Sequence, residues 1–220
     1  MRVSNLGAWL TLAAASLCSH AVQASPASSD SAGTAAPPQR FAVPDTAPSG
    51  LLKQILASAD HGGRPFAIVD KKSATLAVYL GDGRLVGATP VLLGQTPGDQ
   101  SVPGVGERAQ VGQLRPGDRT TPAGRFATEP GHNLSGEPIV WVDYASALAI
   151  HRVRPGPSQE RRVQSLASPD ARDRRMSAGC VVVPEAFYEA VVQPVLGRGP
   201  GVVYVLPETS PAQVARQAQI

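Results

Sequence analysis

Short apolar runs separated by tight polar turns predict a β-rich domain over residues 64–207. The runs with high β-branched and aliphatic content are 66–70, 75–80, 84–94, 139–144, 147–153 and 201–206. The turn at residues 81–83 carries an Asp-Gly pair, which is a strong hairpin signal, so the first three runs predict an antiparallel meander. The last run is predicted to close the sheet.

Helical spacing of apolar residues occurs on both sides of this pattern. Leu51, Leu52, Ile55 and Leu56 predict a short helix over residues 49–63. A second helix is predicted to begin at Pro184 and to end near residue 196, because proline is favoured at a helix start. The predicted fold class is therefore mainly β, a β-rich α+β domain.

Polar segments interrupt or flank this domain. Residues 25–48 are rich in Ser, Ala and Pro and predict a flexible linker, and residues 208–220 predict a disordered tail. Residues 95–124 form a polar stretch that is long for a connection, and such loops are either functional or mobile. Residues 154–173 also have a loop-like composition.

The first 24 residues are typical of a secretory signal peptide. Arg2 precedes an apolar run too short to span a bilayer, and a small-residue cleavage site ends at Ala24. A lipoprotein signal is disfavoured because Leu17 precedes Cys18, and an uncleaved anchor is the remaining alternative. Since the chain has 2 cysteines, cleavage leaves Cys180 as the one thiol of an exported protein. An intramolecular disulfide is then impossible.

Charge and composition narrow the classes of partner. The net charge is +3 and the charged fraction is 17%, without the clustered basic and aromatic residues of a nucleic-acid interface. No transmembrane span follows the signal, so the mature chain is predicted to have no membrane anchor. The arginines at 161–162 and 172–175 are interpreted as a solvated loop that could face an anionic substrate.

Cys180 is the candidate nucleophile. It ends the small-residue loop Ser177-Ala178-Gly179-Cys180 and precedes the β-branched run 181–183. Backbone amides of such a loop can converge on an oxyanion, as acyl transfer to a thiolate requires. Two alternatives remain: a buried apolar cysteine and a redox thiol. One cysteine and scattered histidines do not have the spacing of a metal site.

His151 is the candidate base among the 4 histidines. A thiol nucleophile needs a base or a positive neighbour. His20 leaves with the signal, His61 precedes the sheet, and His132 lies in a turn. Strict alternation in 147–153 puts His151 on the same strand face as Ala147 and Ala149, close to the strand end. A structural strand histidine is the alternative.

Three motifs in order resemble the catalytic domain of the L,D-transpeptidase (YkuD-like) family. They are Ile150-His151, the turn Thr121-Pro122-Ala123-Gly124, and Ser177-Ala178-Gly179-Cys180-Val181. The resemblance covers roughly residues 65–206. It implies a β-sandwich or barrel with a helix after the catalytic cysteine, and an enzyme without a cofactor that acts on peptidoglycan stem peptides in the periplasm and is a carbapenem target.

The resemblance also implies roles for residues. Cys180 would attack the carbonyl before a terminal D-residue, release that residue and form a thioester that an amine resolves, while His151 transfers the protons. The backbone of Ala178, Gly179 and Cys180 would form an oxyanion hole supported by Ser177. The Arg152 carbonyl would orient the imidazole.

Two positions depart from the family pattern. Ala178 replaces a histidine, and Val182 replaces an arginine two residues after the cysteine. Arg174 or Arg175 is predicted to bind substrate in place of that arginine, and the 154–173 insert is interpreted as a lid. Hydrolysis of the same thioester by a carboxypeptidase or amidase, and a non-catalytic wall-binding scaffold, remain alternative functions.

Overall fold

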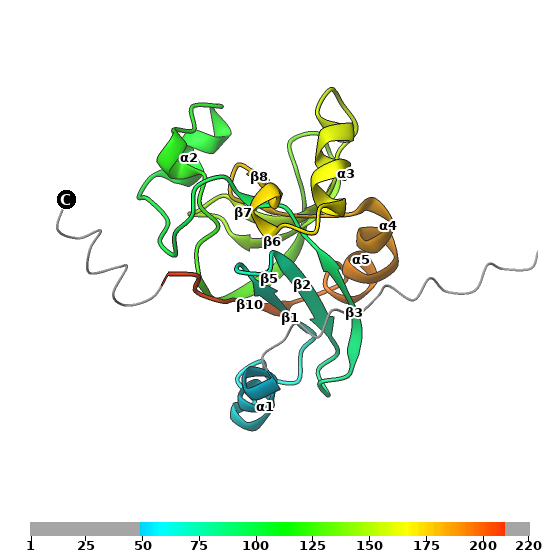
Figure 1. Cartoon of the computed structure of the whole chain (residues 1–220). Coiled ribbons are helices and arrows are strands. Elements are labelled where there is room, and N and C mark those ends of the chain that lie inside the picture. The colour runs from blue at the N-terminus through cyan, green and yellow to red at the C-terminus, as the bar shows by residue number, and fades with distance from the viewer. Residues whose placement is uncertain (1–48, 210–220) are drawn as a thin grey trace, which may run out of the picture. The chain divides into compact units, whose positions relative to one another are not determined.

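The computed structural model describes residues 49–209, and strands make up most of the regular structure (Figure 1). The predicted signal peptide and linker, and residues 210–220 of the predicted tail, lie outside the described residues. The strands are β1 Phe66–Asp70, β2 Thr75–Tyr79, β3 Leu85–Pro90, β4 Leu93–Gly94, β5 Gly124–His132, β6 Pro138–Asp143, β7 Leu148–Arg152, β8 Arg175–Ser177, β9 Val181–Val183 and β10 Gly201–Val205. The helical segments are α1 Ser49–Ser58, α2 Val105–Gln110, η1 Pro116–Asp118, α3 Gln159–Ala167, η2 Ala171–Arg174, α4 Glu185–Phe187, η3 Tyr188–Val192 and α5 Gln193–Val195.

Within residues 49–209, eight strands form one sheet in the order β3-β2-β1-β10-β5-β6-β7-β9. Neighbours are antiparallel except for the pairs β1–β10 and β7–β9, which are parallel. The predicted meander β1-β2-β3 is confirmed, and Gly83 has the positive φ of 85° that its tight turn requires. Strands β4 and β8 pair in a separate two-stranded sheet.

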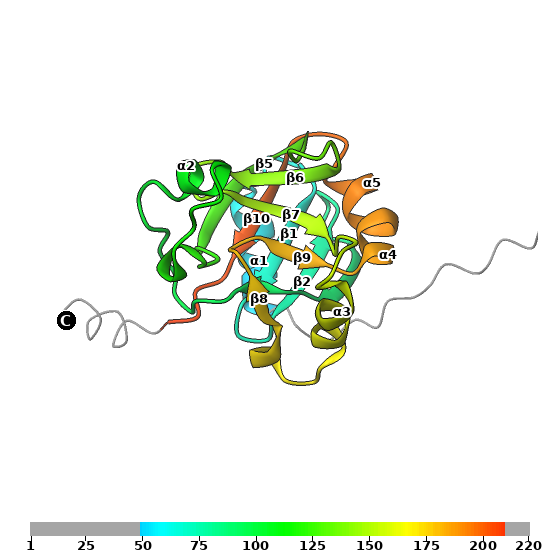
Figure 2. The same cartoon turned by 90° about the horizontal axis from the view of Figure 1, so that it is seen from above.

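The two halves of the large sheet pack their inner faces into one core. Ala67, Val69 and Val203 from β1 and β10 belong to the same buried cluster as Val140 and Ile150 from β6 and β7. In Figure 2, β6, β7 and β9 cross in front of β1 and β2. The sheet therefore curls around its own side chains, and the predicted β-rich sandwich or barrel class is confirmed.

Helix α1 covers the outer face of β1, β2 and β10. Its Ile55 is buried with Phe66, Ile68 and Tyr204, which alternate with the inward-facing residues of their strands. The helix ends at Ser58 and is shorter than the predicted 49–63. Ala59 has a φ of 50°, a left-handed conformation that stops helical propagation.

Strand β10, the predicted last strand, lies inside the sheet and joins β1 to β5. All of its residues are buried, which agrees with a strand covered on both faces. The run at 201–206 is continuously apolar for this reason.

The predicted helix after the cysteine is present, with an irregular centre. Segments α4, η3 and α5 follow one another from Glu185 to Val195, and η3 is a π-helix. Pro194 has no backbone N–H to donate to the preceding turn, which accounts for the wider turn just before it.

Both polar inserts contain helices that the sequence analysis missed. Helix α2 lies in the 95–124 stretch, and α3 lies in the 154–173 insert. Each buries little apolar surface: Val105 and Gly106 in α2, and Leu166 in α3. Because a short helix with one buried apolar side chain has no clear periodicity, its composition looks like that of a loop.

Candidate active site

Strands β7 and β9 bring the candidate base and nucleophile together. They are parallel, with Ile150 opposite Val181 and His151 opposite Val182. Cys180 is the residue immediately before β9, so the same register places it beside Ala149. The loop 177–180, which carries Cys180 and is called the nucleophile loop below, therefore meets the end of β7 at one edge of the sheet.

Cys180 and His151 line one cavity of about 560 Å³. Ala147 and Ala149 line it as well, as the predicted strand alternation requires. Two walls come from segments distant in sequence, helix α2 and the turn at residues 132–135. The lining residues are Gly106, Ala109, Gln110, His132, Asn133, Leu134, Ser135, Ile139, Trp141, Tyr144, Ala147, Ala149, His151, Arg154 and Cys180.

The hydrogen bond of His151 fixes which ring nitrogen can act as a base. Nδ1 lies 2.8 Å from the backbone oxygen of Arg152. A carbonyl oxygen only accepts, so Nδ1 carries the proton and Nε2 has the free lone pair. This contact is the one that the sequence analysis assigned to the Arg152 carbonyl.

Burial keeps both reactive groups neutral. Burial lowers the pKa of His151 to about 4, and the charges of Arg154 and Arg162 add to this, against the Arg152 carbonyl and Glu137, which raise it. Burial also raises the pKa of the Cys180 thiol above its usual value, against a backbone hydrogen bond from Ala149 and the charge of Arg154. At neutral pH the pair is therefore a thiol and an uncharged imidazole, not a preformed ion pair.

The nucleophile loop is held by the hydroxyl of Ser177. Ser177 Oγ accepts a hydrogen bond from the Gly179 amide at 3.1 Å and donates one to the Cys180 carbonyl at 2.6 Å. Because the Gly179 amide is already bonded, it is not free to join the predicted oxyanion hole, which leaves the amides of Ala178 and Cys180 as its candidates. Gly179 has a φ of 127°, and a Cβ there would lie 3.1 Å from the Thr120 carbonyl oxygen, so this position requires glycine.

Thr121 connects the loop to the neighbouring sheet. Its buried hydroxyl donates to the Gly179 carbonyl at 2.7 Å and accepts from the Gly94 amide at 2.9 Å. This is a function for the turn at residues 121–124 beyond reversing the chain. Thr121 holds the backbone next to the candidate nucleophile.

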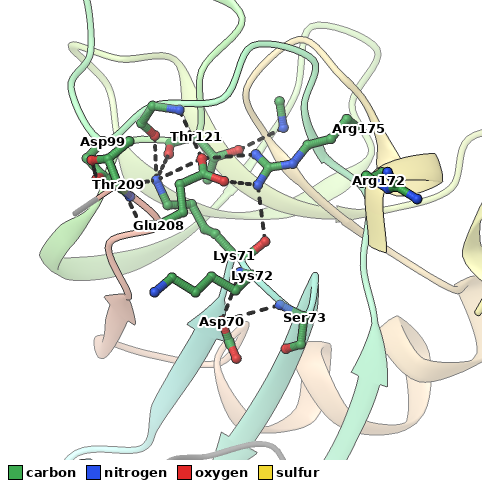
Figure 3. A network of polar contacts seen from close by, with 12 residues as sticks. Asp70, Lys71, Lys72, Ser73, Asp99, Thr121, Arg172, Arg175, Glu208 and Thr209 are labelled. Carbon is green, nitrogen blue, oxygen red and sulfur yellow. Dashed lines mark hydrogen bonds and ion pairs between the residues drawn. The ribbon is translucent and has the colours of Figure 1, made fainter. Parts of the chain in front are cut away.

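A buried ion network lies behind Thr121 (Figure 3). The Lys71 ammonium donates to the carbonyls of Gly98 and Thr121, at 2.5 and 2.9 Å, and to Asp99 at 2.6 Å. The amides of Glu208 and Thr209 also donate to Asp99. Burial raises the pKa of the Asp99 carboxyl, but these hydrogen bonds outweigh burial and lower it to about 2.

Two residues of the predicted tail are therefore part of the folded domain. Glu208 accepts hydrogen bonds from Arg175, and the Thr209 side chain donates to Asp99. The sequence analysis began the tail at 208 because these polar residues carry no apolar pattern.

Arg174 and Arg175 do not line the cavity, so the prediction that they bind substrate there is wrong. The Arg174 guanidinium is buried and donates to the carbonyls of Ser73, Ala74 and Ser168. Arg175 donates to Glu208 and to the Lys71 carbonyl. Their hydrogen-bonding capacity serves the protein interior.

The position of the family arginine is apolar here. Val182 is buried in a small cluster with Leu92, Val153 and Leu166. Leu166 belongs to α3, which packs on this cluster while the insert contributes only Arg154 to the cavity lining. The 154–173 insert therefore packs beside the cavity and does not form the lid over it that the sequence analysis expected.

The cavity side chains that the sequence analysis missed include Trp141, Tyr144 and Arg154. The Trp141 and Tyr144 rings are stacked, with centroids 4.4 Å apart and planes at 26°. Tyr144 is exposed. Trp141 is partly buried, and two aromatic residues three positions apart at the end of a strand are a signal of a binding surface that the sequence contains.

Two features are absent from the part of the chain that the structure describes. Between residues 49 and 209, no helix has the length and apolar character needed to cross a membrane. The same residues contain no group of three or more His, Cys, Asp or Glu side chains arranged to hold a metal ion.

Comparison with known proteins finds similar solved structures at low sequence identity. No family model and no curated protein matches the chain. The catalytic domain of the L,D-transpeptidase from E. faecium is 20% identical over 66% of this chain and 98% of its own, with a TM-score of 0.37. An L,D-transpeptidase from Mycobacterium tuberculosis is 16% identical over 64% of this chain and 57% of its own, with a TM-score of 0.39.

A third similar structure is the helical cell shape determining protein Pgp2 from Campylobacter jejuni. It is 16% identical over 72% of this chain and 56% of its own, with a TM-score of 0.43. The chain thus spans just over half the length of the second and third of these proteins. The structures similar to this chain therefore include L,D-transpeptidase catalytic domains.

Proposed function

We propose that the chain is a cysteine-dependent L,D-transpeptidase that acts on peptidoglycan stem peptides. The observation that carries the proposal is the cavity lined by both Cys180 and His151, in which the Arg152 carbonyl leaves His151 Nε2 as the free base. The sequence motifs around both residues support it. The predicted signal peptide supports action outside the cytoplasm, in the periplasm.

The first half-reaction forms a thioester. His151 Nε2 takes the proton of the Cys180 thiol as the sulfur attacks the carbonyl carbon that precedes the terminal D-residue. The amides of Ala178 and Cys180 stabilise the negative oxygen. The protonated imidazole then gives its proton to the leaving amine, and the terminal D-residue departs.

The second half-reaction regenerates the enzyme. The amine of a neighbouring stem attacks the thioester, His151 takes a proton from that amine, and the proton returns to Cys180 as the new amide forms. If water attacks in place of the amine, the same residues give a carboxypeptidase or an amidase. A neutral thiol and a neutral imidazole in one cavity suit both outcomes, because the proton moves only during attack.

Intact mass spectrometry after incubation with a carbapenem tests the nucleophile and the base. The wild type is expected to gain one adduct on Cys180, the Cys180→Ala variant none, and the His151→Ala variant a much slower one. Iodoacetamide labelling of Cys180 controls for accessibility. Ready labelling without a carbapenem adduct in the wild type would contradict the proposal and leave the scaffold alternative.

Product analysis then separates transfer from hydrolysis. The purified protein is incubated with a stem tetrapeptide, with and without an amine acceptor. A cross-linked or amine-exchanged product that depends on Cys180 supports the transpeptidase. Release of the terminal D-residue at an equal rate without acceptor, and no amine product, would assign the hydrolase.

A further inference from the structure

Arg154 is the cation of the candidate active site. It follows β7 by two residues and lines the cavity together with Cys180 and His151. Its charge acts on both groups, since it lowers the pKa of the imidazole and of the thiol. No Asp, Glu or Lys is among the residues that line this cavity in the described part of the chain. The cavity is therefore suited to an anionic group.

The protein leaves the hydrogen-bonding groups of Arg154 open. Its Nε is buried and lies 3.3 Å from Glu137 Oε2, in an ion pair without hydrogen-bond geometry. Over residues 49–209, no acceptor takes a hydrogen bond from this guanidinium. Its side chain is 39% exposed. An arginine fork with unused N–H groups matches a carboxylate in two parallel hydrogen bonds.

Glu137 holds this guanidinium by an ion pair alone. The Glu137 carboxylate also accepts hydrogen bonds from Arg152 at 2.9 Å and from the Asn133 side chain at 3.0 Å. Arg152 is paired with Glu185 as well, so two carboxylates balance the two arginines, and Arg154 still lines the cavity with N–H groups that make no hydrogen bond within residues 49–209. The turn that carries Asn133 is itself part of the cavity wall.

We propose that Arg154 binds the free α-carboxylate of the terminal D-residue that leaves in the first half-reaction. This inference rests on the proposed function and adds a substrate requirement to it. In a stem peptide that ends one residue after the scissile carbonyl, the carboxylate lies about 3.5 Å further along the chain. Arg154 lines the same cavity as Cys180 and His151, so it can meet a group one residue beyond the scissile carbonyl.

The proposal distinguishes exo-acting from endo-acting chemistry. A transpeptidase or carboxypeptidase that removes one terminal residue always meets a free carboxylate beside the scissile bond. An enzyme that cuts within a longer chain, or detaches a protein, meets a neutral amide there. Arg154 therefore favours removal of a single terminal residue over the amidase alternative.

Binding to the inactive Cys180→Ala protein tests the subsite without turnover. The two ligands are a stem tetrapeptide with a free terminal carboxylate and the same peptide as its terminal carboxamide, and titration calorimetry gives both dissociation constants. Loss of a charge-assisted hydrogen-bonded pair predicts roughly tenfold to a hundredfold weaker binding of the carboxamide. Adding Arg154→Gln is expected to remove this difference, and Arg154→Lys to retain part of it.

Arg161→Gln is the matched control, because it removes an equal charge from an exposed position of α3. It is expected to keep the full preference for the carboxylate. An unchanged carboxylate-to-carboxamide ratio in Arg154→Gln would overturn the subsite. So would equal binding of the two peptides to the protein that keeps Arg154.

Turnover by the wild type separates failure of this subsite from failure of the proposed function. If the wild type consumes both peptides at equal rates, the acyl-transfer function stands and the role of Arg154 is wrong. If the wild type consumes neither peptide and Cys180→Ala binds neither, the proposed function and the subsite fail together.

Discussion

Two arginine-bearing segments flank the nucleophile loop, and they use their charge in opposite ways. In the segment 173–177 that leads into the loop, Arg174 and Arg175 donate to carbonyls and to Glu208 inside the protein. In the segment 151–154 at the end of β7, Arg154 keeps its guanidinium open toward the cavity. Both segments contain two arginines in the sequence, so the number of internal partners decides which arginine can meet a ligand.

This difference divides stability from chemistry. A buried guanidinium that donates to several backbone carbonyls fixes the backbone around it, and removing it leaves those carbonyls without donors. A guanidinium with few internal partners contributes little to folding and remains available for binding. Substitution of Arg154 should therefore reduce function without unfolding the protein, whereas substitution of Arg174 or Arg175 should reduce stability.

Replacement of His151 by Gln is expected to have the largest effect. The variant keeps a polar group near the Arg152 carbonyl but has no basic nitrogen, so acylation of Cys180 by a carbapenem should slow roughly a thousandfold. Stopped-flow fluorescence or mass spectrometry measures the rate, and circular dichroism checks that the fold is retained. A folded variant that acylates within tenfold of the wild type would exclude His151 as the base.

Arg174→Ala should be the most destabilising change in the segment before the loop. The guanidinium donates to three backbone carbonyls at 2.9, 3.3 and 2.6 Å. Leaving them unsatisfied should lower the free energy of unfolding by roughly 3 kcal/mol in urea titrations. Arg172→Ala is the control: within residues 49–209 this arginine forms its ion pair with Asp170, and its side chain is 91% exposed. The urea midpoint of Arg172→Ala is expected to be unchanged. Similar losses of unfolding free energy in Arg172→Ala and Arg174→Ala would contradict the structural role of Arg174.

Thr121→Val tests whether the Lys71 network reaches the nucleophile. Valine keeps the shape of threonine but removes the hydroxyl that joins the Gly94 amide to the Gly179 carbonyl, at a cost of about 2 kcal/mol. Acylation should slow several-fold because the loop backbone loses its support. Thr121→Ser keeps the hydroxyl and should recover both values. If Thr121→Ser is acylated as slowly as Thr121→Val, the packing of the threonine methyl group, and not the hydrogen bond, supports the loop.

Elements that depend on local sequence patterns were predicted correctly, whereas contacts between residues far apart in sequence were not specified by those patterns. The strands β1, β2, β3, β6 and β7 were predicted because their apolar runs and turns are local signals. The side-by-side placement of Cys180 and His151 depends on a parallel pairing between β7 and β9, which local patterns do not specify. Strand alternation indicated the face of His151, and the motif order indicated its partner.

The missed features share one cause. Helices α2 and α3 bury few apolar residues, so their sequences show no apolar periodicity that would predict them. Contacts with the rest of the chain stabilise them. The role of each arginine depends on carbonyls far away in sequence, such as Ser73 for Arg174. Sequence reasoning can find charged residues near a motif, but tertiary contacts determine which of them remain open.

The smallest predicted effect is a shift of the acid limb of the pH–rate profile. His151 must be neutral to accept the thiol proton, and its pKa of about 4 means that acylation should persist well below pH 6 and fall only as the pH approaches 4. Arg154 is one cause of this low pKa, so Arg154→Gln should raise the pKa and move the acid limb to higher pH. Arg162 acts in the same direction and Glu137 in the opposite one, so Glu137→Gln should move the limb to lower pH.

The rate of carbapenem acylation between pH 3.5 and 8, divided by that at the plateau, measures the limb in each variant, with Arg161→Gln as the control of equal charge. A limb that stays in place in Arg154→Gln would mean that burial alone sets the His151 pKa and that the charge left open at the end of β7 acts on ligands and not on the base.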